Sequence, residues 1–342
     1  MLARRPFLAL AGAVASAVIG LSAPASAQTP LKFSLDWKFE GPAAPFLLAL
    51  EKGYYAEAGL DVSIDTGKGS LEAIPRVASG TYPMGFADIN SLVKFRDQNP
   101  DLDVKAVMIM YNKPPFAIVG RKSLGVDVPK DLEGKTLGAP APDGAYAQWA
   151  AFVAANDIDA SKVAIENVGF PVREPMLARG EVQAITGFSF SSFINLKANE
   201  VPEDDISVLL MADYGLDLYG NAIMVNPDFA ADNPDAVKGF IAATIKGLAD
   251  VIANPEEGVE AVLKYNDVAR KEVELERLNM ALAQNILTDE TAANGFGGVD
   301  YARFNRSIKQ IAQTYDFEGD LPAGEDVFTD AFLPPADARM LQ

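Results

Sequence analysis

Strand-like and helix-like segments alternate along the first third of this chain, and this alternation restricts the possible folds more than any other feature of the sequence. Short apolar stretches are separated by longer segments with helical spacing, and a glycine is expected to end the first helix. The pattern predicts strands at 31–35, 60–65, 82–87 and 104–110, with helices at 41–59, 71–79 and 90–97. Such alternation is typical of an α/β fold with a mainly parallel sheet and helices on both faces.

The alternation starts again after 111–116, where two prolines interrupt the pattern. This second series predicts strands at 116–119, 135–140, 163–168, 182–188 and 206–213, and helices at 146–156 and 173–179. Beyond 219–226 the chain is mostly helical, with predicted helices at 235–253, 256–265, 271–287 and 301–315. We therefore expect two lobes, 31–114 with 215–342 and 115–214, joined twice to form a hinge beside a ligand cleft. A single doubly wound domain is the alternative.

The first 27 residues have the pattern of an export signal. Arg4 and Arg5 precede an apolar stretch that is too short for an ordinary membrane span, and Ala25-Ser26-Ala27 forms an A-x-A cleavage signal. We expect cleavage near Ala27 and a periplasmic mature protein, exported by the general or the twin-arginine route. Because there is no cysteine, we expect no lipid anchor.

The chain contains neither cysteine nor histidine. Disulfides, thiolate and imidazole metal ligands, and a Ser-His-Asp triad are therefore excluded, and we expect a binding protein without catalytic residues, metal site or cofactor. The net charge is −18, from 29 basic and 47 acidic residues, so nucleic acid and anionic membranes are poor partners. We expect a monomer whose only membrane contact is peripheral, through a membrane protein complex.

The segment SLDWKFEGPAAPFLLALEKGYYAEAGLDVSID, at 34–65, resembles the start of the periplasmic solute-binding proteins of ABC importers for pyrimidine precursors, sulfonates and taurine. Segments at 73–92, 129–140 and 174–188 resemble later parts of the same family, in the same order and with similar spacing. The resemblance implies a type II periplasmic binding protein with two lobes and a hinge. It also implies a small-molecule ligand and delivery of that ligand to the permease subunits of an ABC importer.

Ligand-binding residues in such a fold gather where strands end and helices begin. Trp37 is the first candidate because its ring can stack on a planar ligand, whereas burial in a core is the alternative for this side chain. Asp36 either contacts ligand or caps the next helix. The further candidates of the first lobe are Glu40, Gly69 and Ser70 in glycine loop 67–70, and Asp88 and Asn90, with Asn90 as a helix cap in the alternative interpretation.

The second lobe and the crossings supply the other candidates. Asp143 and Gly144 open a helix and can present backbone N–H groups, and Tyr146 can add an aromatic wall. Arg173 either binds a carboxylate or sulfonate or, as we slightly favour, pairs with Glu174 or Glu181 at the surface. The remaining candidates are Phe188 and Ser189 at a strand end, and Tyr111, Tyr219 and Asn221 at the crossings.

These features predict a solute-binding protein that closes over a small planar or anionic organic solute, such as a pyrimidine-like heterocycle, an aromatic acid or a sulfonate. Segment 188–193 offers only serine and phenylalanine, where pyrimidine-binding relatives commonly place a polar or acidic side chain. Two alternatives are an extracellular sensor input domain and an enzyme on the same fold.

Overall fold

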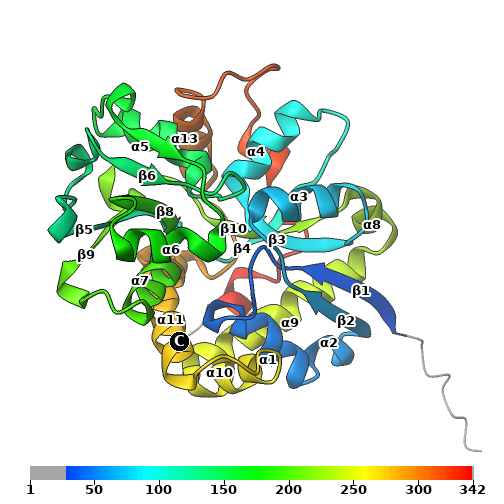
Figure 1. The fold of residues 1–342 in the computed structure, drawn as a ribbon. Helices are drawn as coiled ribbons and strands as arrows, with labels where there is room; N and C mark the ends of the chain where they lie inside the picture. The colour runs from blue at the N-terminus through cyan, green and yellow to red at the C-terminus, as the bar shows by residue number, and fades with distance from the viewer. Residues whose placement is uncertain (1–27, 341–342) are drawn as a thin grey trace, which may run out of the picture.

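The computed structural model describes residues 28–340 and contains two mixed β-sheets, each flanked by helices (Figure 1). We call the half of the protein around each sheet a lobe. The signal segment and its cleavage site lie outside the described residues. None of the helices in residues 28–340 is long and apolar enough to cross a membrane.

The first sheet has the strand order β2-β1-β3-β10-β4, in which β10 comes from the second half of the chain. Its strands are β1 (Thr29–Ser34), β2 (Leu60–Asp65), β3 (Met84–Asp88), β4 (Lys105–Ile109) and β10 (Asn221–Val225). Strand β10 is antiparallel to both of its neighbours, whereas β1 is parallel to β2 and β3. The inserted strand shows that the chain returns to the first lobe after building the second.

The second sheet repeats this arrangement, with the order β7-β6-β8-β5-β9. Its strands are β5 (Phe116–Arg121), β6 (Thr136–Gly138), β7 (Ala164–Glu166), β8 (Ala184–Phe188) and β9 (Ile206–Leu210). Here β5 is the antiparallel strand and lies between β8 and β9. The two sheets therefore confirm the predicted α/β class with two lobes, and the alternative of one doubly wound domain is wrong.

The helices of the described chain pack around both sheets, and several from the C-terminal half lie below the first sheet in this view (Figure 1). Those of the first half are α1 (Ala44–Glu51), α2 (Tyr54–Glu57), α3 (Ser70–Ala78), α4 (Ile89–Gln98), α5 (Trp149–Ala155), α6 (Phe170–Arg179) and α7 (Ser189–Ala198). The others are α8 (Pro227–Asp232), α9 (Pro234–Ala253), α10 (Pro255–Leu263), α11 (Lys271–Ala281), α12 (Asp289–Asn294), α13 (Tyr301–Ile311) and α14 (Gly324–Val327).

Among the differences between the predicted and the observed helices, three have a clear physical reason. The single helix expected at 41–59 is broken at Gly53, whose φ of 74° lies in the left-handed region and ends α1. Helix α6 begins at Phe170 rather than at Arg173, because Pro171 fits the first turn, where no backbone N–H is needed. Helix α7 was not predicted, since its serines and phenylalanines have modest helix propensity and packing against α6 and α11 stabilises it.

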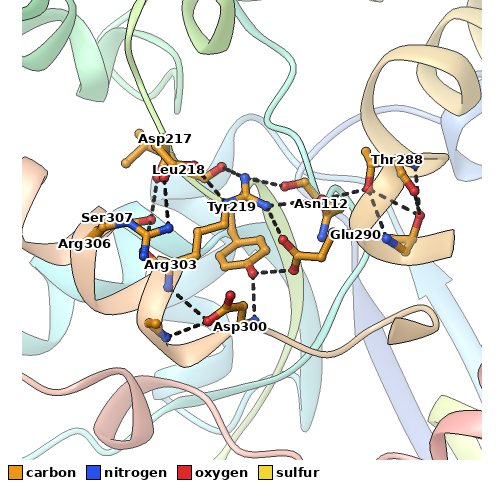
Figure 2. Close-up of polar contacts among 12 residues, drawn as sticks. Asn112, Asp217, Leu218, Tyr219, Thr288, Glu290, Asp300, Arg303, Arg306 and Ser307 are labelled. Carbon is orange, nitrogen blue, oxygen red and sulfur yellow. Dashed lines mark hydrogen bonds and ion pairs between the residues drawn. The ribbon is translucent and has the colours of Figure 1, made fainter. Parts of the chain in front are cut away.

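The two chain crossings are held together by α13, which packs on both lobes. Phe304 and Ile308 belong to the core of the first lobe, whereas Ile311 packs into the core of the second. Arg303, on the same helix, donates hydrogen bonds to the backbone carbonyls of Asn112 (3.0 Å) and Leu218 (2.7 Å), one on each crossing (Figure 2). The Arg303 guanidinium thus connects both crossings of the hinge to one helix.

Candidate ligand-binding cleft

Two adjoining cavities of about 30 Å³ each lie between the lobes, and together they form what we call the cleft. A volume of this size holds one or two water molecules, so a ring-shaped ligand enters only when the lobes move apart. Both cavities are bounded by Asp36, Trp37, Phe188 and Ser191. The first cavity also contacts Gly69, Ser70, Asp143, Gly144, Phe170 and Arg173.

The lobes touch at the rim of this cleft. Gly69, with a φ of 105°, packs so closely on the second lobe that a Cβ there would lie 2.5 Å from the Pro142 carbonyl oxygen. Lys94 of α4 donates a hydrogen bond to the Ala147 carbonyl oxygen at 2.7 Å. Glycine at position 69 therefore lets the two lobes approach closely.

Asp36 follows β1 and is 5% exposed. Its Oδ2 atom accepts hydrogen bonds from the Ser70 hydroxyl (2.9 Å) and from Asn221 Nδ2 (2.6 Å). Burial raises the pKa of Asp36 to about 7, although these two hydrogen bonds act in the opposite direction. Near neutral pH the carboxyl is therefore divided between its protonated and ionised forms, and it can face a ligand as donor or acceptor.

Trp37 forms an aromatic pair across the cleft with Phe170, which the sequence analysis missed. The ring centroids are 4.7 Å apart with an interplanar angle of 71°, an edge-on contact between one residue of each lobe. The indole Nε1–H donates to Glu40 Oε2 at 3.2 Å. A planar ligand that entered between the lobes would replace the contact between Trp37 and Phe170 with stacking on one or both rings.

Glu40 lines the second cavity, but its carboxylate is already paired with protein groups. Arg277 of α11 lies 2.7 Å from its Oε2 atom, and the Ser191 hydroxyl lies 3.5 Å away. Ser70 is likewise occupied, since its hydroxyl donates to Asp36 and accepts the Asp88 N–H at 3.1 Å.

Asp88 and Asn90 line neither cavity. Asp88 caps α4 by accepting the backbone N–H groups of Asn90 (3.0 Å) and Ser91 (2.8 Å), so the predicted cap at Asn90 is wrong. Burial raises the pKa of Asp88. Asn90 instead donates to the Tyr219 carbonyl oxygen at 2.7 Å, which connects α4 to the second crossing.

Arg173 is 3% exposed, and the surface ion pair that we favoured is wrong in its position. The guanidinium pairs with Glu174 at 2.6 Å and lies 3.6 Å from Asp143, both of them buried. Glu181 pairs with Arg179 instead. The pKa of Asp143 is raised by burial, and the nearby Arg173 guanidinium offsets only part of this rise. The one guanidinium of the first cavity thus already faces two carboxyl groups.

The other candidates of the second lobe divide between the cleft and its surroundings. Gly144 and Phe188 line it. Ser189 is fully buried and donates to Gln284 Oε1 at 3.1 Å, while Ser191, which the sequence analysis did not single out, faces both cavities. Tyr146 lies in a 3₁₀ turn before α5 and lines neither cavity.

The candidates on the two crossings are also divided between the cleft and other parts of the molecule. Tyr111 lines the second cavity, where burial raises the pKa of its hydroxyl well above the usual value. Asn221 reaches the site through its bond to Asp36. Tyr219 lines neither cavity, and its hydroxyl donates to Glu290 and accepts the Asp300 N–H (Figure 2).

Residues 42–258, more than half of the chain, match the family described as NMT1/THI5 like. The chain belongs to the NMT1/THI5-like family.

Relatives of this family member include both binding proteins and enzymes. The riboflavin-binding protein RibY of Chloroflexus aurantiacus is 29% identical over 85% of this chain and 82% of its own length. The formylaminopyrimidine-binding protein of Halalkalibacterium halodurans is 26% identical over 86% and 88%. A Legionella pneumophila protein named 4-amino-5-hydroxymethyl-2-methylpyrimidine phosphate synthase is 22% identical over 91% and 95%.

Solved structures confirm the periplasmic binding protein fold. The alkanesulfonate-binding protein SsuA of Xanthomonas axonopodis, bound to MOPS, has a TM-score of 0.68 and 11% sequence identity, covering 89% of this chain and 100% of its own. The likeness extends over both lobes, so the family member has the architecture of the solute-binding proteins of ABC importers.

Proposed function

We propose that this protein is the periplasmic solute-binding subunit of an ABC importer and that it captures an uncharged, planar nitrogen heterocycle of the pyrimidine or flavin type. Lobe 1 comprises 31–114 and 215–342, and lobe 2 comprises 115–214. The ligand binds between them and is enclosed when the hinge closes. The closed protein then delivers it to the permease.

The observation that carries this choice of ligand is the combination of aromatic rings with carboxyl groups at the cleft. Trp37, Phe170 and Phe188 supply flat apolar surface from both lobes. Asp36 and Asp143 supply acceptors for ring N–H and amino groups, and the pKa of Asp36 near 7 also permits donation to a ring nitrogen or carbonyl.

The charge at the cleft disfavours the anionic ligands that the sequence left open. Arg173 is the guanidinium of the first cavity, and Glu174 and Asp143 already neutralise it. A sulfonate or carboxylate ligand would have to compete with two buried carboxyl groups for that cation, at a large cost in desolvation. The names of the riboflavin-binding and formylaminopyrimidine-binding relatives support a heterocycle in the same way.

The test is a titration of the purified mature protein with a panel of neutral and anionic ligands, measured by thermal shift and calorimetry. The panel comprises riboflavin, riboflavin 5′-phosphate, formylaminopyrimidine, taurine and an alkanesulfonate. We expect a neutral heterocycle to raise the melting temperature and the sulfonates to leave it unchanged, with the phosphate ester weaker than riboflavin. Binding of a sulfonate without binding of any heterocycle would refute this ligand class.

Trp37→Ala tests the position of the site. Loss of stacking should weaken binding of the best ligand by about fivefold to about a hundredfold, because aromatic stacking on a base contributes about 1–3 kcal/mol. Trp149→Phe is the matched control, since Trp149 stacks on Phe152 in the core of the second lobe. Equal effects of the two substitutions would contradict the proposed site.

The distant synthase relatives make an enzyme the second candidate. Incubation of the best ligand with the protein, followed by mass spectrometry, tests this directly. We expect the ligand to be recovered unchanged, because the chain contains no histidine or cysteine for general acid–base or nucleophilic chemistry.

A further inference from the structure

The loop that carries Trp37 is held in place by α11, a helix that follows it by more than two hundred residues. The Gly41 N–H donates to Glu274 Oε2 at 2.6 Å. A Cβ at Gly41 would lie 2.3 Å from the Glu274 backbone oxygen, so only glycine permits this approach. One turn along α11, Arg277 reaches Glu40. Two consecutive residues of the loop are therefore fixed to one helix.

Glu40 connects this attachment to the indole ring. Its Oε2 atom accepts a hydrogen bond from Trp37 Nε1 at 3.2 Å and lies 2.7 Å from a terminal nitrogen of Arg277. Both nitrogen groups therefore meet at the same carboxylate oxygen. The orientation of the ring therefore depends on where Arg277 holds that oxygen.

Arg277 also contacts the second lobe. Its other terminal nitrogen donates to Asn195 Oδ1 on α7 at 3.0 Å. One turn earlier on the same helix, the Ser191 hydroxyl lies 3.5 Å from Glu40 Oε2. When the second lobe docks, α7 thus adds contacts to both members of the ion pair between Glu40 and Arg277.

The charge at this point makes Arg277 difficult to replace. It is 3% exposed and faces two carboxylates, Glu40 and Glu274, the second at 3.1 Å. Removing the guanidinium would leave two buried acidic groups without their cation. Lysine would keep the charge but not the planar fork that reaches Glu40 and Asn195 together.

We propose that Arg277 is a positioning residue of the cleft, which orients Trp37 through Glu40 and couples that orientation to docking of the second lobe through Asn195. The inference rests on the proposed function only in so far as Trp37 contacts ligand. The geometry of the ring itself is independent of any ligand.

The indole N–H of Trp37 reports on this geometry directly. The chain has two tryptophans, so an NMR spectrum of the indole N–H groups contains two signals, and Trp149→Phe identifies the signal of Trp37. We expect Arg277→Met to accelerate hydrogen exchange of the Trp37 indole about tenfold and to shift its resonance. Arg277→Lys and Glu40→Gln should give smaller changes of the same kind, because each keeps part of the contact.

Lys197→Met is the matched control. Lys197 also joins α7 to α11, through an ion pair with Glu276 at 2.5 Å, but it has no contact with the Trp37 loop among the described residues. We expect this variant to leave the Trp37 signal unchanged. The proposal is overturned if Arg277→Met changes Trp37 exchange by less than twofold, or if Lys197→Met changes it equally. Should Arg277→Met fail to fold, Arg277→Lys and Glu40→Gln decide, and no change in either overturns the proposal.

Titration with the best ligand from the panel separates this inference from the proposed function. We expect Arg277→Lys to bind it several-fold more weakly and Lys197→Met to bind it as the unaltered protein does. Unaltered binding by Arg277→Lys, despite a changed Trp37 signal, would refute the claimed effect on the cleft. If no panel compound binds the unaltered protein while Arg277→Met still changes the Trp37 signal, the proposed ligand class fails and the positioning role stands.

Discussion

Replacement of Asp36 by asparagine should stabilise the protein at neutral and alkaline pH. Asp36 is 5% exposed, and burial raises its pKa from 3.8 to about 7. Asparagine has nearly the same shape, and its side-chain oxygen can accept the bonds from Ser70 and Asn221 that now reach Oδ2. The substitution therefore removes the ionisation and keeps the packing.

The magnitude follows from the shift in pKa. The folded-state pKa lies above the unfolded value, so between pH 4 and pH 7 the folded protein binds about one proton more than the unfolded chain. Stability from this group is present below pH 4 and is lost as the pH rises through 7. A shift from 3.8 to about 7 is about 3 units, or about 4 kcal/mol at 1.36 kcal/mol per unit.

Urea-induced unfolding at several pH values between 4 and 8 measures the effect. The difference in unfolding free energy, Asp36→Asn minus the unaltered protein, should rise by about 4 kcal/mol between pH 4 and pH 7 and then level off. Taking this difference removes the contributions of groups that do not interact with Asp36, such as Asp143, whose pKa burial also raises.

Asp61→Asn, on the exposed side of β2, is the matched control and should give a flat difference over the same range. A flat difference for Asp36→Asn as well would refute the reasoning, because it would mean that the buried carboxyl does not titrate between the two pH values. A difference that falls with increasing pH would show that the folded protein favours the ionised form.

The hinge and the lobe contacts give three further predictions. Arg303→Met should lower the unfolding free energy by about 2–4 kcal/mol in urea unfolding, since it leaves two backbone carbonyls of the crossings without a donor. Arg306→Met, which removes an exposed ion pair on the same helix, is the control and should lower it by under about 0.5 kcal/mol. Gly69→Ala should hold the lobes apart, because its Cβ would meet the Pro142 oxygen at 2.5 Å. Small-angle scattering should then give a larger radius of gyration, and an unchanged radius would count against a closed arrangement. Trp37→Ala combined with Gly69→Ala should weaken ligand binding more than Trp37→Ala alone, because open lobes also lose the contacts of Phe170 and Phe188 with ligand. Calorimetry measures this difference, and no additional loss would count against binding between the lobes.

Much of the fold could be predicted because its signals are local. Alternating apolar residues and the turns between them placed the strands to within a few residues, except for β10, which was not predicted. The break at Gly53 was missed because a positive φ at a glycine depends on how α1 and α2 pack, and helical spacing continues across it. Helix α7 was missed because its stability comes from neighbouring helices rather than from its own propensities.

The sequence by itself determined the chemistry available to this protein: no imidazole or thiol, two series of βα units, and a tryptophan beside an aspartate at the first strand end. The tertiary structure alone decided which of these groups meet. Phe170 faces Trp37, Asn221 bonds Asp36, and Arg277 holds Glu40, in each case over more than one hundred residues of chain. Such contacts depend on how the two sheets and the C-terminal helices pack, and no local pattern of residues records that packing.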